Sequence, residues 1–205
     1  AALLGSACFA IPVSKNNAQI LSRDLIQISV GTAVQVVRPM ATIPQFNPAL
    51  NYYESAIVGQ GYHMAAMLNG GLALERVREW LHYDWDEFYR EFDENPCDIP
   101  TDLIFLPYLV GERTPYRNAR ARGAWIGLGL HHSRRDLMVA ALFGVACTVR
   151  LGLETLLGTD KLKTLSEYEL RFVGGSSRRS GWVTLIASVI GQELNVYENA
   201  DFSGK

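Results

Sequence analysis

Two short runs of β-branched and apolar residues near the start of the chain predict a β-hairpin. Residues 24–30 and 33–38 are rich in Ile, Val and Gln, and only Gly31 and Thr32 separate them. Two residues between two such runs are the spacing of a tight hairpin turn. After a loop that contains prolines, residues 52–67 carry aromatic and small residues that suit one or two further strands.

The apolar period then changes to that of a helix. The positions that approximate a 3.6-residue repeat are Leu72, Leu74, Val77, Trp80 and Leu81. The acidic and aromatic residues 84–94 predict a second, shorter helix. Residues 103–109 are an apolar run that suits a buried strand, and residues 123–128 predict another short strand.

The second half of the chain predicts a long helix and then a strand–turn–helix unit. Ser133 and Asp136 have the spacing of a capping box, which opens a helix that extends to about residue 157. Residues 170–173 predict a strand, and an amphipathic helix is expected at residues 182–190. There is no internal repeat, low-complexity tract or clear linker.

Composition narrows the class of protein. The 205 residues are 48% hydrophobic, enough for one large folded domain or two small ones. A net charge of −2 gives no electrostatic reason to expect binding to nucleic acid or to an anionic membrane. The sequence has no uninterrupted run of about 18 apolar residues, so it does not predict a transmembrane helix. Cys8, Cys97 and Cys147 are odd in number and widely spaced, which argues against a disulfide framework or a zinc site and favours a reducing cytoplasm.

Three glycine turns at the ends of regular elements are candidates for a nucleotide site. They are Gly31-Thr32 in the hairpin, Gly70-Gly71 before a helix, and Gly174-Gly175 between a strand and a helix. Glycine lets a ligand lie against the backbone, and the first N–H groups of a helix favour anionic ligands. Each turn alone also fits a plain connection or a helix cap, so the prediction depends on the three together.

Other candidate residues give weaker evidence of a functional role. The histidines, among them His131 and His132, lack metal-binding spacing, which favours structural or surface roles and no metal site. Glu112 could act as an acid or base, but a salt bridge with Arg113 or another arginine is the favoured interpretation. No G-x-S-x-G elbow and no Walker A lysine motif occur.

Five segments, in order along nearly the whole chain, together resemble the C-terminal part of the FGGY carbohydrate kinases, and among these the xylulokinases. The segments are the hairpin at 28–33, the glycine-led helix at 67–75, the loop at 105–115, the family signature at 123–142 and the adenosine motif at 173–182. The loop from Gly111 to Pro115 and the signature are the most specific of them.

The resemblance implies an α/β fold, namely one actin-like (ribonuclease-H-like) domain with a mixed sheet flanked by helices. This would be one of the two domains of a sugar kinase, with ATP in the cleft between them. The implied roles are terminal-phosphate binding for Gly31 and Thr32, approach to phosphates or ribose for Gly70 and Gly71, and contact with adenosine for Gly174, Gly175 and Arg179. Mg²⁺ would neutralise phosphate charge during in-line transfer to a sugar hydroxyl.

The resemblance also predicts what lies outside the sequence. The family's catalytic aspartate normally comes shortly before a small-residue segment like residues 1–7, and no acidic residue precedes Asp24. We therefore expect the catalytic Asp just upstream of Ala1. Residues 1–205 are expected to be a C-terminal kinase-domain fragment, inactive alone, that lacks the N-terminal domain and the last C-terminal elements. Ser176, Arg179 and Phe143 depart from the family's pattern.

The predicted function is ATP-dependent phosphorylation of a sugar hydroxyl in the cytoplasm, with D-xylulose converted to D-xylulose 5-phosphate. Two alternatives stay open: another FGGY kinase, acting on ribulose, gluconate or a related polyol, and a noncatalytic nucleotide-binding domain. The partners expected are the sugar and ATP, without nucleic acid or membrane. A homodimer is possible, since the small residues Ala140, Ala141, Gly144 and Ala146 of the long helix suit either a dimer or the core.

Overall fold

The computed structural model describes residues 24–40, 46–55, 58–95, 98–158 and 165–196. The expectations for residues 1–11, for Cys8 and Cys97, and for residues 201–205 lie outside these ranges. Within them, the elements follow the order that the hydrophobic pattern predicts.

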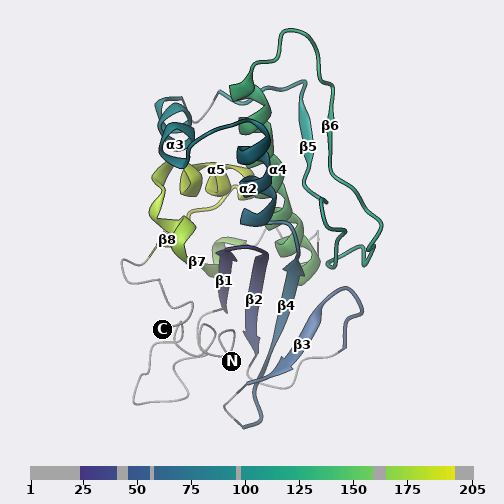
Figure 1. Cartoon of the computed structure of the whole chain (residues 1–205). Helices are drawn as coiled ribbons and strands as arrows, with labels where there is room; N and C mark the ends of the chain where they lie inside the picture. The colour runs from purple at the N-terminus through teal and green to yellow at the C-terminus, as the bar shows by residue number, and fades with distance from the viewer. Residues whose placement is uncertain (1–23, 41–45, 56–57, 96–97, 159–164, 197–205) are drawn as a thin grey trace.

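The strands are β1 (Asp24–Val30), β2 (Val34–Met40), β3 (Asn51–Glu54), β4 (Gly61–Met67), β5 (Ile104–Leu106), β6 (Ala124–Ile126), β7 (Tyr168–Val173) and β8 (Asn195–Val196). The helices are α2 (Gly71–Trp80), α3 (Trp85–Glu94), α4 (Arg134–Leu157) and α5 (Ser180–Ile190), with a 3₁₀ turn, η2, at Gly175–Arg178 (Figure 1). Some bounds differ from the prediction: β7 begins two residues before 170, and α5 begins two residues before 182. The buried strand expected at residues 103–109 is only the three-residue β5, in which Ile104 is exposed. The turn η2 and the strand β8 were not predicted.

The main sheet is mixed, as predicted. Its strand order is β3-β4-β2-β1-β7-β8, in which β1, β2, β4 and β3 pair antiparallel, while β7 runs parallel to β1 and β8 parallel to β7. Val30 pairs with Val34 across the hairpin, and Ser29 pairs with Val173. The ends of β1 and β7 therefore meet at one edge of the sheet, where the hairpin turn and the Gly174-Gly175 turn follow them. β5 and β6 form a separate two-stranded sheet.

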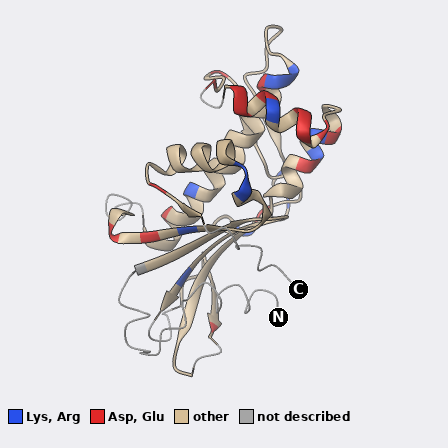
Figure 2. Cartoon of the chain, turned by 90° about the vertical axis from the view of Figure 1, so that its left-hand side faces the viewer, with Lys and Arg blue, Asp and Glu red and all other residues tan. Residues whose placement is uncertain are grey.

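The described helices form a layer over the sheet. Ile26, Ile28 and Val36 are fully buried on the strands, and α4 packs across β2 and β4 and alongside α5. In Figure 2 the helices lie above the strands, and the charged residues gather at the end of the helical layer away from the sheet. Burial of this apolar face is the main force that holds the two layers together.

Helix α4 is the core helix of the domain. Ser133 accepts a hydrogen bond from the Asp136 N–H, and the Asp136 carboxylate accepts one from the Ser133 N–H, so the predicted capping box is confirmed. By length and hydropathy α4 could cross a membrane, but 67% of its apolar window is buried inside the domain. A helix buried in this way is a core element, because its apolar surface is already covered by protein.

The small residues of α4 serve the core and not a dimer. Ala140, Ala141, Gly144 and Ala146 are all buried within the domain. A Cβ at Gly144 would collide with the carbonyl oxygen of Phe105 in β5. The predicted homodimer therefore cannot use this helix face.

Two glycines of α4 should respond differently to an added methyl group. Gly144→Ala should lower the free energy of unfolding by about 1–3 kcal/mol, because the methyl meets rigid backbone of β5. Gly152→Ala should lower it less: its methyl would lie 2.6 Å from the end of the flexible Met67 side chain and 2.9 Å from a methyl group of Val36, and the gain in helix propensity of about 1 kcal/mol partly offsets these contacts. Urea unfolding followed by circular dichroism measures both variants, and equal losses would contradict this packing.

Candidate functional site

The tip of the β1–β2 hairpin presents open backbone to solvent. The turn has three residues, Gly31 to Ala33, so the two-residue turn expected from the sequence is one residue too short. Gly31 N–H donates to the Ala33 carbonyl at 3.0 Å, and a Cβ at Gly31 would meet nothing within 4 Å. The Thr32 N–H and hydroxyl have no hydrogen-bond partner among the described residues. These two donors are free to bind a ligand.

The other side of the tip is docked on the start of α2. The N–H groups of Gly70 and Leu72 donate to the Thr32 carbonyl at 3.2 and 3.1 Å, and the Gly71 N–H donates to the Gly31 carbonyl at 2.6 Å. A Cβ at Gly71 would lie 2.7 Å from that Gly31 oxygen. The first N–H groups of α2 therefore hold the hairpin, and glycine is needed here because two backbones touch.

The Gly174-Gly175 turn lies beside the hairpin tip. Gly174 has φ +97°, a left-handed conformation that favours glycine. The Ser176 hydroxyl donates to the Val30 carbonyl at 2.7 Å, which ties the turn to the end of β1. A Cβ at Gly175 would meet nothing within 4 Å. The turn continues as the 3₁₀ segment η2, and α5 follows it from Ser180.

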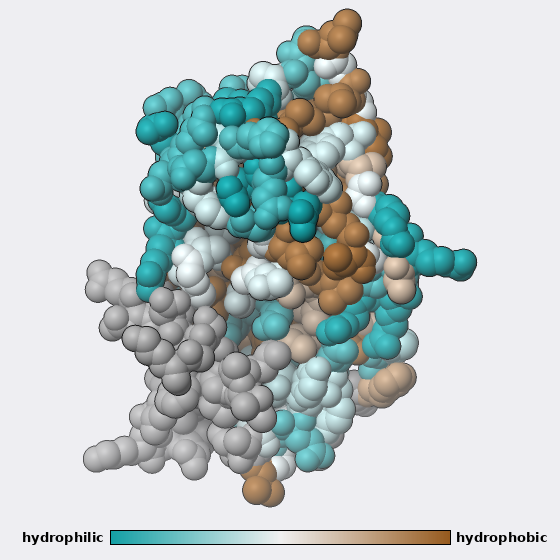
Figure 3. Space-filling model, in the orientation of Figure 1, coloured by the Kyte–Doolittle hydropathy of each residue, from teal (hydrophilic) through white to brown (hydrophobic). Residues whose placement is uncertain are grey.

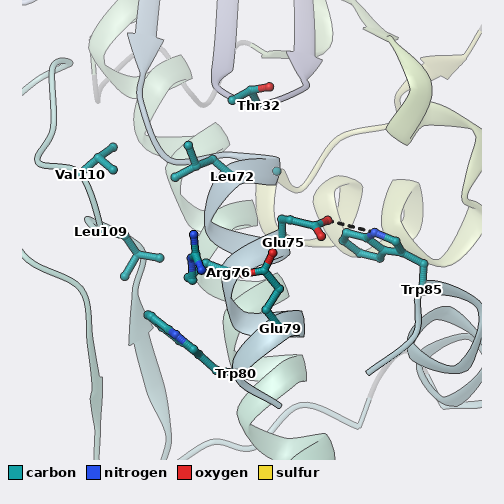
Figure 4. A pocket seen from close by; sticks show the side chains of 10 residues that line it. Thr32, Leu72, Glu75, Arg76, Glu79, Trp80, Trp85, Leu109 and Val110 are labelled. Carbon is teal, nitrogen blue, oxygen red and sulfur yellow. Dashed lines mark hydrogen bonds and ion pairs between the residues drawn. The ribbon is translucent and has the colours of Figure 1, made fainter. Parts of the chain in front are cut away.

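Two adjoining cavities lie beside these turns, and Gly71 and Trp85 line both of them. The larger, of about 750 Å³, is lined by Thr32, by the outer face of α2 and by Leu109 and Val110 (Figure 4). The smaller, of about 290 Å³, is lined by Gly175, Arg179 and Tyr89 among others. Figure 3 shows hydrophilic residues over α3 on this face and hydrophobic residues on the β5–β6 side. Together the cavities form a trough across the start of α2.

The carboxylates that line the trough are paired with arginines. Glu75 accepts hydrogen bonds from Arg78, at 2.5 Å, and from the indole N–H of Trp85, at 3.0 Å. The Arg78 hydrogen bond holds the pKa of Glu75 below its usual range. Arg76 forms an ion pair of 2.6 Å with Glu79. Both carboxylates that line the trough are thus held by cations.

An aromatic wall that the sequence reasoning missed closes the smaller cavity. The rings of Trp85 and Tyr89 stack with centroids 5.5 Å apart, and the Arg179 guanidinium lies 4.6 Å from the centre of the Tyr89 ring. Arg179 also lies 3.6 Å from Asp86, and burial raises the pKa of Tyr89. The four-residue spacing of Trp85 and Tyr89 in α3 was the available signal, because it places both rings on one helix face.

Glu112 has a different role from the one expected. Its side chain is buried, and it accepts hydrogen bonds from the backbone N–H groups of Leu68 and Arg113, both at 2.7 Å, and from the Asn69 amide at 3.2 Å. Within the described part of the chain Glu112 forms no salt bridge with an arginine, contrary to expectation, and it accepts the backbone N–H of Arg113 instead.

Asp102, His131 and His132 meet at the far end of the β5–β6 sheet. The Asp102 carboxylate lies 2.9 Å from His131 Nε2 and 3.1 Å from His132 Nε2, and these hydrogen bonds lower the pKa of Asp102. These are ligand types that bind metals. However, His132 Nδ1 accepts the Gly129 N–H at 2.9 Å, so the ring proton lies on Nε2, toward Asp102. The favoured interpretation is a structural hydrogen-bonded cluster.

The mixed sheet and the trough at its edge define an α/β domain of the actin-like class. Comparison with models of protein families matches residues 49–203 to the C-terminal domain of the FGGY family of carbohydrate kinases. The chain belongs to this family. The predicted family, its xylulokinase-like character and the predicted fold are confirmed.

The relatives are sugar kinases. The chain is 25% identical over 166 residues to the xylulose kinase of Staphylococcus xylosus, and the aligned region covers 79% of this chain and 33% of that protein. It is 25% identical over 193 residues to the gluconokinase of Bacillus licheniformis, with 87% and 36% covered. A solved structure described as a xyloylose kinase from Brucella ovis matches with TM-score 0.76 and 29% identity, over 88% of this chain and 37% of that one. The chain spans about a third of the length of these relatives.

Two glycines of the trough should tolerate an added methyl group very differently. Gly71→Ala should lower the free energy of unfolding by about 1–3 kcal/mol, because its Cβ meets the Gly31 carbonyl. Gly175→Ala should change it by no more than about 0.5 kcal/mol, because its Cβ points into open space. Chemical unfolding of both variants measures the difference. A Gly71→Ala protein as stable as the unsubstituted one would show that the hairpin and helix are not in tight contact.

Proposed function

We propose that this chain is the ATP-binding half of a sugar kinase that phosphorylates D-xylulose. ATP would donate its terminal phosphoryl group to a sugar hydroxyl, with D-xylulose 5-phosphate and ADP as products. Membership of a carbohydrate-kinase family supports the reaction class, and the xylulose kinases among the relatives support the sugar. The domain assignment, residues 1–205 as a C-terminal kinase domain, belongs to the same proposal.

The observation that carries the nucleotide assignment is the pair of open turns at one sheet edge. In this proposal the Thr32 N–H and hydroxyl donate to a terminal phosphate oxygen, while Gly31 leaves the space beside them free. Gly175 and Arg179 line the smaller cavity, and in this proposal they contact adenosine together with the neighbouring Gly174. Gly71 lines both cavities and approaches the phosphates or ribose through its carbon atom, because its N–H group holds the hairpin. Gly70 is buried against Ala33 and lines neither of these cavities, so the contact with the ligand expected for it has no support.

Mg²⁺ fits this trough only through the nucleotide. Glu75 and Glu79 are the carboxylates among the described lining residues, and both are bound by arginines. We therefore expect ATP phosphate oxygens, together with water, to hold the ion, whose charge would offset that of the phosphates during transfer. The residues of this chain would position the phosphoryl group for in-line attack.

The sugar and the catalytic base belong to the proposal as well. The Asp expected upstream of Ala1 would accept the proton of the attacking hydroxyl. A cytoplasmic location follows from a reaction that consumes ATP on a metabolic sugar, and the free thiol of Cys147 agrees with a reducing compartment.

A gluconate kinase is the second candidate, because gluconokinases match this chain at the same 25% identity.

ATP should stabilise this chain, and Gly175→Val should reduce that stabilisation. A ligand that binds only the folded state stabilises it by RT ln(1 + [L]/Kd), so the melting temperature rises with the concentration of ATP and with its affinity. Because Gly175 faces open space, a valine at this position should leave the fold intact. Its side chain should occupy part of the space proposed for adenosine and lower the affinity for ATP about tenfold or more. Thermal unfolding with and without MgATP measures this. Equal stabilisation of both proteins would remove Gly175 from the site, and no stabilisation of either would contradict nucleotide binding.

A panel of sugars given to the complete gene product should identify the substrate. We expect D-xylulose to give the highest kcat/KM in a coupled ADP-release assay, ahead of D-ribulose, D-gluconate and glycerol. A higher value with gluconate would replace the first candidate by the second. ATP binding without turnover of any sugar would indicate a noncatalytic nucleotide-binding domain.

A further inference from the structure

Glu112 is a buried acidic side chain without a cation beside it. Only 3% of the residue is exposed, and its three hydrogen-bond partners among the described residues are N–H donors. Burying a carboxyl group is costly unless its oxygens are fully hydrogen-bonded. Two of the donors belong to Leu68 and Asn69, more than forty positions earlier in the sequence. The group therefore joins two separate segments.

Asn69 completes this link. Its amide Nδ2 donates to the Gly111 carbonyl at 2.7 Å as well as to Glu112, and its Oδ1 accepts the Val110 N–H at 3.3 Å. Asn69 itself is fully buried. The segment that leaves β4 is thereby fixed to the loop at residues 110–113 through every polar atom of the Asn69 side chain.

The same segment leads directly to the contact with the hairpin. Gly70 and Gly71 follow Asn69, and their N–H groups donate to the carbonyls of Thr32 and Gly31. Because the Gly31 carbonyl faces α2, the Thr32 N–H of the same trans peptide group points away from α2. A shift of Asn69 would move this support and with it the two donors.

We infer that Glu112, acting through Asn69, is a positioning residue for the phosphate end of the nucleotide site. Glu112 does not touch the ligand; it fixes the start of α2, which orients the Gly31–Ala33 tip toward the terminal phosphates. The inference rests on the proposed function, since it requires ATP in the trough. It predicts that a change at Glu112 weakens binding of the phosphates and spares binding of adenosine.

Glu112→Gln is the sharpest test of this role. Gln keeps the shape of the side chain, but its NH₂ group must face an N–H donor, most simply the amide of Asn69. We expect ATP affinity to fall about tenfold or more, with adenosine affinity changed less than about twofold. Isothermal titration, or competition against a fluorescent ATP analogue, measures both affinities on the 205-residue chain. Glu154→Gln, which removes a carboxylate paired with Arg150 on α4, is the matched control and should change neither.

The outcomes separate this inference from the proposed function. If the unsubstituted chain binds no ATP, the proposed function fails. If it binds ATP and Glu112→Gln binds ATP equally well, or loses ATP and adenosine in equal measure while folded, Glu112 is not a phosphate-positioning residue. Should Glu112→Gln fail to fold, Asn69→Ser removes the same link from the other side, and it should show the same selective loss of ATP affinity.

Discussion

The site depends on one contact, in which the first N–H groups of α2 are bonded to the carbonyl oxygens of the β1–β2 hairpin. Helix N-termini commonly bind anions, but here the hairpin takes that position. The hairpin is in turn held next to the Gly174-Gly175 turn, because β7 runs parallel to β1 and Ser176 bonds to Val30. Three glycine turns far apart in the sequence thus converge at one edge of the sheet.

Features set by neighbouring residues could be predicted from the sequence. The hairpin, the capping box of Ser133 and Asp136, and the order of strands and helices depend on interactions within a few positions, which leave a local pattern. The β1–β2 turn is longer by one residue than its pattern indicated, since Ala33 stays outside the ladder. Such bounds depend on contacts with the partner strand and with α2, and a sequence window of one strand contains no information about these contacts.

Features set by distant residues could not be predicted in this way. Glu112 lies next to Arg113 in the sequence, which favoured a salt bridge, but its partners come from the segment after β4. Trp85 enters the site because Glu75, ten positions away on another helix, binds its indole N–H. The resemblance to a family placed ligand-binding roles on glycines and Arg179. It also marked the loop that contains Glu112, but it assigned no role to that side chain.

The glycines of the site differ in what requires them. At Gly71 a side chain would strike the hairpin, whereas at Gly31 and Gly175 a side chain would meet no atom of the described protein. Glycine carries an entropic cost in a folded chain. Neither Gly31 nor Gly175 has the positive φ that accounts for other glycines beside open space, such as Gly158, so a ligand that fills the space is the better explanation for these two. That distinction makes Gly175 and Gly31 stronger evidence for a ligand than Gly70 and Gly71, although all four occur in turns that look alike in the sequence.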